Sequence, residues 1–405
     1  MRLKILTLNK KILIVSECFY PEEFKINDIA LNWKDRGYEV EVLTLVPTYP
    51  KGKVFPGYKN KIFYKETFQG INVFRIHAVT GYVESPIKKS LKYINFMLIA
   101  SVVAIFKGRQ YDYIFGYNLG ALTDMVPAVI IRKLYKKPML IWVQDLWPDS
   151  VYAYGFRETR FLTSFLNYFV KFIFKNVSYI AISGKGFESK LRPYVKGSQK
   201  FHYLPNWADD LNMDLEAETL SKDSKVHFTF AGNIGKVQNL ENIINSFCSL
   251  PDEYQKRAQL NIVGDGSNLK NLKALAGNNQ AIIFYGHINR DYMAKYYKAS
   301  DFLIISLIDK PIFSVTVPAK IQTYIKAKKP ILAIINGDVA DIVINNNLGL
   351  YAIPSDLSSI TEVFKKCIDM PAFKRSKFIE NNDKILMTTF NKDTIINDLT
   401  NILIT

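Results

Sequence analysis

The pattern of hydrophobic and polar positions predicts alternating strands and helices. Residues 11–16 (KILIVS) form a short β-branched run that ends in a small polar residue, as buried parallel strands do. A helical spacing of Ile29 and Trp33 follows and ends at Gly37, a residue type that often closes a helix. The run 39–45 (EVEVLTL) then predicts a second strand, so the chain opens as a βαβ unit of a doubly wound sheet.

The same alternation continues along two successive halves of the chain. The first half has further predicted strands at 73–77, 113–115, 139–143 and 179–182, and helices at about 88–107, 121–136 and 158–176. A polar stretch at 205–225 then interrupts the pattern, and we interpret it as an interdomain linker. The second half has predicted strands at 227–231, 260–263, 282–285, 302–305 and 331–334, and helices at 239–249, 269–276, 290–299 and 319–327.

We therefore expect an α/β protein with two Rossmann-like, doubly wound domains. The N-terminal domain is predicted at 1–208 and the C-terminal domain at 209–385. Residues 386–405 are expected to form a C-terminal helix that packs back on the N-terminal domain. A length of 405 residues suits two such domains better than one.

The charge balance changes the picture, because a formal net charge of +16 needs an anionic partner: nucleic acid, a membrane or a substrate. No RRM, KH, helix-turn-helix or zinc signature supports nucleic acid. Three widely spaced cysteines and four scattered histidines disfavour a disulfide framework or a metal site, and a reducing cytosol fits them.

Two stretches mix lysines with apolar and aromatic residues, near 88–109 and at 161–175 (FLTSFLNYFVKFIFK). Such mixtures are typical of surfaces that insert apolar groups among anionic headgroups, although core helices with a solvated lysine face are the alternative. The longest apolar run, Ile94–Phe106, is shorter than the ~20 residues that span a bilayer. The first residues do not resemble a signal peptide.

Two glycine-containing loops follow predicted strands of the second half. The first contains Gly232, Asn233, Gly235 and Lys236, and the second contains Gly264, Asp265 and Gly266. Such glycines let the backbone approach a phosphate, and a lysine adds positive charge, although tight βα turns look the same. Because both loops lie at the edge where parallel sheets bind ligands, together they favour a nucleotide site.

A third segment places Lys320 and Gln322 near a helix start, after Pro318 and before Thr323. Helix starts attract anions, and the alternative is an ordinary solvated first turn. A fourth segment, Gln144–Ser150, closes a predicted strand. Its carboxylate Asp145 is placed to orient a sugar hydroxyl or assist proton transfer, unless an aspartate here only caps a helix.

The loop after the first strand is a fifth candidate, either a loop that reaches a cleft or an irregular βα connection. Its polar and aromatic members are Tyr20, Pro21, Glu22, Lys25 and Asn27. The chain contains no D-x-D triplet, P-loop or G-x-S-x-G elbow, and no G-x-G-x-x-G follows the first strand. These absences disfavour a metal-dependent sugar transferase, an ATPase, a hydrolase and an NAD enzyme.

Taken in order, these segments resemble glycosyltransferase family 4, the retaining transferases with the GT-B fold, and within it the bacterial branch that adds amino sugars. The resemblance covers about residues 11–400. It is carried by residues 19–30, 36–52, 57–60, 143–151 (VQDLWPDSV), 204–209, 230–244 (FAGNIGKVQNLENII), 262–269 (IVGDGSNL), 285–307 and 317–332 (VPAKIQTYIKAKKPIL).

The resemblance implies a hexosyltransferase with its active site in a central cleft between the two domains. A UDP-sugar would bind the C-terminal domain, with the Gly232–Lys236 loop on the diphosphate and the Gly264–Gly266 loop near the base. A polyprenyl-diphosphate saccharide would bind the N-terminal domain at the inner face of the plasma membrane, with Asp145 in the active-site region. No metal or cofactor is implied.

The chain departs from the family pattern at several positions. The family's diphosphate-binding arginine and lysine match Asn233 and Gln238, so we expect Lys236 to substitute for them. The family's paired glutamates fall on Val315 and Thr323.

In the same segment, Lys320 and Gln322 follow the amino-sugar branch, and Gln144 replaces the histidine before the aspartate. We expect retaining transfer in which Lys236 and Lys320 stabilise the leaving diphosphate. The alternatives are a GT-B sugar-nucleotide epimerase and a degenerate transferase that acts as a scaffold.

Overall fold

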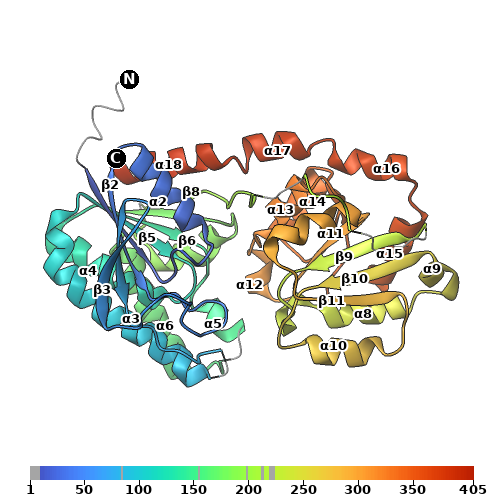
Figure 1. Cartoon of the computed structure of the whole chain (residues 1–405), viewed down its shortest axis with the longest axis horizontal. Coiled ribbons are helices and arrows are strands. Elements are labelled where there is room, and N and C mark those ends of the chain that lie inside the picture. Colours follow the sequence, from blue (N-terminus) through green and yellow to red (C-terminus); the bar gives the residue numbers. More distant parts are fainter. Residues whose placement is uncertain (1–9, 84, 154–155, 198, 211–213, 219–223) are drawn as a thin grey trace. The chain divides into compact units, whose positions relative to one another are not determined.

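The computed structural model forms two compact units. It describes residues 10–83, 85–153, 156–197, 199–210, 214–218 and 224–405. Unit 1 comprises Met1–Leu204 with Asp393–Thr405, and unit 2 comprises Pro205–Lys392 (Figure 1). The first division, at 204/205, lies close to the boundary expected at 208/209. The second lies at 392/393 rather than at 385/386, so residues 386–392 belong to unit 2. The predictions made for residues 1–9 and for part of the linker lie outside the described residues.

The described part of unit 1 contains an eight-stranded sheet in the order β3-β4-β2-β1-β5-β6-β7-β8. Its strands are β1 (Lys11–Ser16), β2 (Glu39–Leu45), β3 (Phe63–Phe68), β4 (Ile71–Ile76), β5 (Tyr113–Asn118), β6 (Met139–Val143), β7 (Tyr179–Ile182) and β8 (Phe201–Tyr203). All pairs are parallel except β3 with β4. The order reverses between β1 and β5, which makes the carboxyl ends of these strands a topological switch point.

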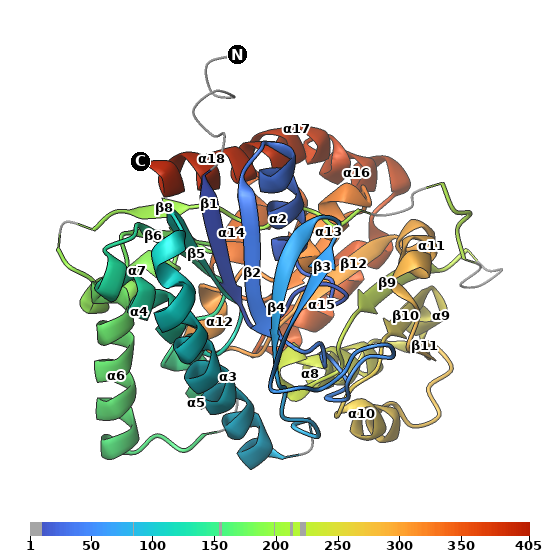
Figure 2. The same ribbon diagram turned by 60° about the vertical axis from the view of Figure 1, so that its left-hand side comes forward.

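Helices cover both faces of this sheet, as the burial of β1 from Ile12 to Ser16 requires (Figure 2). They are α2 (Lys25–Asp35), α3 (Pro86–Lys107), α4 (Val126–Tyr135), α5 (Asp149–Ala153), α6 (Arg160–Lys175), α7 (Phe187–Leu191) and α18 (Lys392–Ile404). The C-terminal α18 lies beside α2 in both views, and the indole N–H of Trp33 donates to the Thr400 hydroxyl at 2.8 Å. The end of the chain therefore belongs to the N-terminal unit.

The described part of unit 2 contains a six-stranded, all-parallel sheet in the order β11-β10-β9-β12-β13-β14. Its strands are β9 (Val226–Ala231), β10 (Ala258–Val263), β11 (Ile282–Gly286), β12 (Phe302–Ser306), β13 (Ile331–Ile334) and β14 (Gly349–Tyr351). Counted from β9, this is the 3-2-1-4-5-6 order of nucleotide-binding folds, with the switch point between β9 and β12. The predicted fold of two Rossmann-like units is confirmed.

The helices of unit 2 pack around a core in which Phe364 contacts two other buried rings. They are α8 (Leu240–Cys248), α9 (Asp252–Lys256), α10 (Leu269–Ala276), α11 (Met293–Ala299), α12 (Pro311–Ser314), α13 (Lys320–Lys326), α14 (Asp338–Asn345), α15 (Leu357–Asp369), α16 (Ala372–Ser376) and α17 (Asn382–Thr388). The Phe364 ring on α15 meets Phe228 and Phe247 edge-on, with centroids 4.9 and 5.5 Å away.

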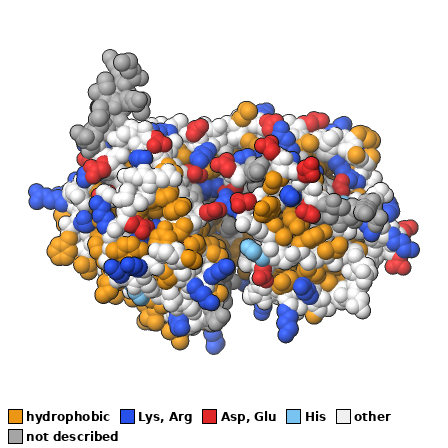
Figure 3. Space-filling model, in the orientation of Figure 1, with side chains coloured by type: hydrophobic (Ala, Val, Ile, Leu, Met, Phe, Trp, Pro, Cys, Tyr) orange, Lys and Arg blue, Asp and Glu red, His pale blue; other side chains and the backbone are white. Residues whose placement is uncertain are grey.

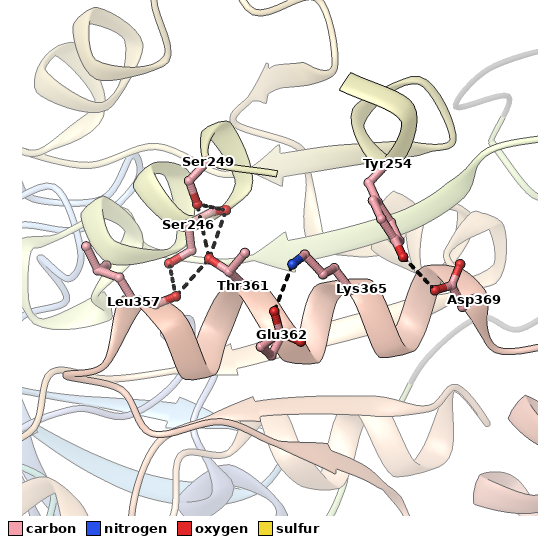
Figure 4. Close-up of polar contacts among 8 residues, drawn as sticks. All are labelled: Ser246, Ser249, Tyr254, Leu357, Thr361, Glu362, Lys365 and Asp369. Atoms are coloured by element: carbon pink, nitrogen blue, oxygen red, sulfur yellow. Dashed lines mark hydrogen bonds and ion pairs between the residues drawn. The ribbon is translucent and has the colours of Figure 1, made fainter. Parts of the chain in front are cut away.

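Polar contacts border this core along α15 (Figure 4). The Thr361 hydroxyl donates to the Ser246 carbonyl at 3.3 Å, and Tyr254 donates to the Asp369 carboxylate at 2.9 Å. The polar contacts join α15 to α8 and α9, whereas the rings join α15 to α8 and to strand β9.

Helix α3 (Pro86–Lys107) agrees with the helix predicted at about 88–107 and extends well beyond the apolar run Ile94–Phe106. With the turn that follows, Pro86–Gln110 is long and apolar enough, by length and composition, to cross a membrane. The expectation that this apolar segment is too short to span a bilayer was therefore wrong. Its Phe96, Ala100 and Ala104 are buried and α3 packs against α4, so one face of this helix belongs to the folded unit.

We expect Phe364→Ala to lower the free energy of unfolding of unit 2 by about 3–5 kcal/mol, because it removes a fully buried ring from two edge-on contacts. Phe373→Ala on α16 is the matched control, since that ring is 64% exposed. Calorimetric unfolding of both variants measures the difference. Equal losses in the two variants would contradict this account of the core.

Candidate functional site

The loops at the switch point of unit 2 interlock through their backbones. The Ile234 N–H donates to the Asp265 carbonyl and the Gly232 N–H donates to the Val263 carbonyl, each at 2.9 Å. A Cβ atom at Gly264 would overlap the Gly232 carbonyl, and one at Gly266 would overlap the Ile234 backbone. Packing of the two loops on each other therefore requires the second pair of glycines.

Gly232 is needed for a different reason, because the space beside its Cα is occupied by the Lys320 ammonium. Lys320 Nζ lies 4.2 Å from the centroid of the Phe230 ring at the end of β9. Within the described part of the chain, Lys320 makes no other polar contact, and burial lowers its pKa to about 8. The first glycine loop and α13 thus place the Lys320 ammonium against a backbone without a side chain, and no described residue supplies a counter-ion.

The other predicted residues of the first loop lie around this pair. Asn233 and Lys236 are exposed. The Gly235 N–H donates to the Gln238 side chain at 2.9 Å, which closes the 3-10 turn that begins at Lys236. Lys236 and Lys320 thus lie at the same end of the sheet, but Lys236 is exposed to solvent whereas Lys320 lies against the first glycine loop.

The remaining predicted residues of α13 differ in their surroundings. Gln322 is fully buried, and neither amide atom has a hydrogen-bond partner among the described residues. The Thr323 hydroxyl donates to the Ala319 carbonyl at 3.3 Å, a bond within the helix. The Pro318 carbonyl accepts the Ile321 N–H at 3.1 Å. In the second loop, the Asp265 carboxylate accepts the Gly266 N–H at 2.7 Å.

At the switch point of unit 1, a buried cluster of charges that sequence patterns did not indicate lies beyond β1. Lys92 of α3 forms an ion pair with Glu17, and its ammonium lies 4.1 Å from the Tyr82 ring centroid. Asp124 is hydrogen bonded to Glu17, and burial together with that carboxylate raises the pKa of Asp124 well above its usual range. Asp124 therefore favours its neutral form more than a solvated aspartic acid does, and Lys92 is paired with Glu17.

This cluster corrects the expectation that the lysines near 88–109 share one membrane surface. Lys92 is buried and faces the sheet. The sequence near Lys92 does not distinguish it from the exposed lysines, because its partner Glu17 is 75 residues away along the chain. Lys89, in contrast, lies near enough to Asp145 to lower the pKa of that carboxyl by its charge.

Asp145 and Gln144 follow β6, next to the end of β5. The Gln144 N–H donates to the Asn118 carbonyl at 2.9 Å. The Asp145 carboxylate accepts the Leu146 N–H at 2.9 Å and is hydrogen bonded to Ser150, while burial raises the pKa of Asp145 to about 6. The predicted active-site carboxyl thus titrates close to neutral pH, as suits a group that handles protons.

The predicted loop Tyr20–Asn27 is tied down by its own polar groups. The buried Glu22 carboxylate accepts the N–H groups of Thr48 and Tyr49, at 2.8 and 2.6 Å. Asn27 donates to the Glu22 carbonyl at 2.8 Å and accepts the Tyr20 N–H at 3.0 Å. Pro21 is half-buried within this loop, and Lys25 begins α2. Glu22 and Asn27 therefore hold the loops after β1 and β2 in place.

Helices α3 and α6 each carry a row of exposed apolar side chains. They are Ile87, Leu91, Ile94, Leu98, Val102, Ile105 and Phe106 on α3, and Phe161, Phe165 and Tyr168 on α6. In Figure 3, hydrophobic side chains gather over the part of unit 1 that Figure 1 labels α3 and α4. Spacings of three and four residues place each set along one side of its helix.

Comparison with known proteins shows which class of protein this chain is similar to. Residues 213–385, within unit 2, match the family model "Glycosyl transferases group 1". "Probable glycosyltransferase WbjE" of Pseudomonas aeruginosa is 21% identical over 296 residues, 70% of this chain and 73% of that protein. "Putative colanic acid biosynthesis glycosyl transferase WcaI" of Escherichia coli K12 is 24% identical over 255 residues, 60% of this chain and 61% of that protein.

Solved structures agree along nearly the whole chain. Sucrose-phosphate synthase of Thermosynechococcus elongatus superposes with a TM-score of 0.72 at 15% identity, over 97% of this chain and 98% of that one. HepE of Anabaena, solved with UDP and glucose, superposes with a TM-score of 0.66 at 14% identity, over 97% and 98%. The fold is that of GT-B glycosyltransferases. The chain is a glycosyltransferase, and its second unit contains a group 1 glycosyltransferase domain.

We expect Gly264→Ala to destabilise unit 2 by about 3 kcal/mol or more, because the new methyl group overlaps the Gly232 carbonyl. Gly277→Ala is the matched control, since Gly277 also has a positive φ, of 56°, but nothing lies within 4 Å of a Cβ there. The control should lose only the cost of backbone strain, about 1–3 kcal/mol, and Gly264→Ala should lose more than the control. Thermal unfolding compares the two, and equal losses would contradict the interlocking of the loops.

We expect Asp145→Asn to stabilise the protein more at pH 8 than at pH 4.5. The folded-state pKa of about 6 lies above the unfolded value of about 3.9, so the stability that Asp145 supplies when protonated is lost as the pH rises through this range. The measurement is the difference in thermal midpoint between variant and wild type at each pH. A difference in thermal midpoint that is the same at both pH values would show that burial does not raise the pKa of Asp145.

Proposed function

We propose that this glycosyltransferase moves an N-acetylated amino sugar from a UDP-sugar to a polyprenyl-diphosphate-linked saccharide, with retention of configuration, in the synthesis of a surface polysaccharide or glycan. The observation that carries the proposal is the Lys320 ammonium beside Gly232, which lacks a counter-ion among the described residues. A donor diphosphate would supply the missing negative charge, and the absence of a side chain at Gly232 lets the ammonium lie against the loop backbone.

The nucleotide is proposed to be UDP. HepE, which shares the fold, is solved in complexes with UDP and with UDP-glucose. The loops after β9 and β10 lie at the switch-point edge where such folds bind nucleotides. In this assignment the Gly232–Lys236 loop contacts the diphosphate, and the Gly264–Gly266 loop lies near the base.

The kind of sugar and pathway is inferred from the sequence and its relatives. Lys320 and Gln322 follow the pattern of the amino-sugar branch of glycosyltransferase family 4. The name of WcaI refers to colanic acid biosynthesis, which supports surface polysaccharide as the product class. Gln322 is the specific candidate for selecting the sugar, because its buried amide is available to pair with a ligand group.

The proposed reaction takes place at C1 of the donor sugar, next to the diphosphate that the two lysines would bind. The bond between the sugar C1 and the diphosphate oxygen breaks, the acceptor oxygen bonds to C1 on the same face, and the hydroxyl proton leaves with UDP. Lys320 and Lys236 stabilise the charge that grows on the leaving diphosphate, and Asp145 orients a sugar hydroxyl or assists proton transfer. The proposal requires no metal ion or cofactor, because lysines supply the positive charge.

We also propose that unit 1 binds the inner face of the plasma membrane, where a polyprenyl acceptor lies. The exposed apolar sides of α3 and α6 would enter the headgroup region, and Lys88, Lys171 and Lys175 would meet anionic lipids. The surplus of 53 basic over 37 acidic residues favours such a surface. The protein is accordingly proposed to be cytoplasmic and peripheral.

We expect Lys320→Ala to lower kcat for transfer from a UDP-sugar by about 100-fold or more, since it removes the cation closest to the leaving group. Lys236→Ala is the matched comparison, and its exposed lysine should matter by less than about 10-fold. A panel of UDP-sugars with a polyprenyl-diphosphate saccharide acceptor measures both, and NMR of the product gives the anomer. Loss of binding alone, with kcat unchanged, would reject the catalytic role.

We expect Leu98→Glu and Phe165→Glu to weaken sedimentation with vesicles containing phosphatidylglycerol by about 10-fold or more. Both side chains are more than half exposed, so the folded unit should tolerate the change. Phe373→Glu, in unit 2, is the control with a similarly exposed ring. If all three variants bound vesicles as the wild type does, the α3 and α6 surface would not be the membrane contact.

A further inference from the structure

A basic hollow lies at the opposite edge of the unit 1 sheet from Asp145. It has a volume of about 390 Å³, and its lining includes Arg132, Lys136, Pro138, Ser178, Tyr179 and Lys196. Pro138 and Ser178 directly precede β6 and β7, whereas Gln144 and Asp145 follow β6. A strand of five residues separates the two edges by ~16 Å, so this hollow is distinct from the proposed reaction site.

The hollow carries uncompensated positive charge. Its lining holds three cationic side chains, Arg132, Lys136 and Lys196, and no carboxylate. In the part of the chain that the structure describes, none of the three forms an ion pair. Helices α4 and α6 end nearby, and their carboxyl ends supply only about half a negative charge each. A surplus of roughly two positive charges remains.

Hydrogen bonds within unit 1 hold these groups in position. The Arg132 guanidinium donates through Nη1 to the Lys137 carbonyl at 3.2 Å, which leaves its other N–H groups available. The Gln199 side chain accepts the Lys196 N–H at 2.8 Å and donates to the Val177 carbonyl at 3.0 Å, so it fixes the segment that carries Lys196. The Ser178 hydroxyl accepts the Met139 N–H at 3.0 Å and keeps its own proton for donation.

We infer that this hollow binds a phosphate-type anion. A tethered guanidinium, two ammonium groups and a hydroxyl donor match the multiple charges and oxygens of a phosphate better than those of a single carboxylate. The shared chemistry is a phosphate group, whether it belongs to a soluble compound or to a lipid headgroup. The site does not depend on the donor or acceptor assigned above.

The test is the thermal midpoint of the full chain at constant ionic strength, with inorganic phosphate or dihexanoyl-phosphatidylglycerol replacing chloride. We expect either probe to raise the wild-type midpoint by about 2 °C or more. The Arg132→Gln/Lys136→Gln variant should lose most of this shift. The matched control, Lys256→Gln/Lys270→Gln, removes two exposed lysines of unit 2 and should keep it.

Phosphate that binds at Lys320 contributes equally to all three proteins, so their difference reports the hollow alone. A difference between wild type and variant with both probes indicates a general phosphate site, and a difference with the lipid alone indicates a headgroup site. Lys196→Gln serves as a second, single-site variant and should also reduce the shift. Equal shifts in the wild type and the Arg132→Gln/Lys136→Gln variant, or no shift with either probe, would overturn the inference.

Discussion

Parallel pairing is the constraint on which the rest of the structure depends. Because parallel sheets are buried on both faces, their strands are almost wholly apolar and polar side chains gather where the strands end. In unit 2 this edge brings the Gly232 loop to Lys320, and in unit 1 it brings Asp145 to Lys89 and Glu17 to Lys92. Chemistry and fold are thus linked by the direction of the strands.

At the carboxyl-end edge of each sheet, one ionisable side chain is buried so that its charged form is disfavoured. Burial lowers the pKa of Lys320 to about 8 and raises the pKa of Asp145 to about 6, so both groups favour their neutral forms more than they would in water. Such perturbed groups are expected where a ligand or a reaction supplies the missing partner. For Lys320 the proposed partner is a diphosphate, and for Asp145 it is a sugar hydroxyl.

Periodicity predicted the buried strands well, because runs such as 227–231 and 302–305 have few alternatives to a parallel strand. It missed β3, whose Phe63–Phe68 alternates exposed and half-buried positions at a sheet edge, and the strands β8 and β14, which have only three residues each. Local motifs likewise located both glycine loops. They could not show that Gly264 and Gly266 serve loop packing, or that Lys92 turns inward to Glu17, because those partners are distant in sequence.

The central claim is that the Lys320 ammonium binds the donor diphosphate. At pH 8 about half of these lysines are neutral in the free protein, and a bound diphosphate should restore the proton. Calorimetric titration with UDP in buffers of different ionisation enthalpy counts the protons exchanged. The account predicts an uptake of about half a proton per UDP in the wild type and none in Lys320→Met. Binding of UDP without proton uptake, or with uptake unchanged in that variant, would contradict it.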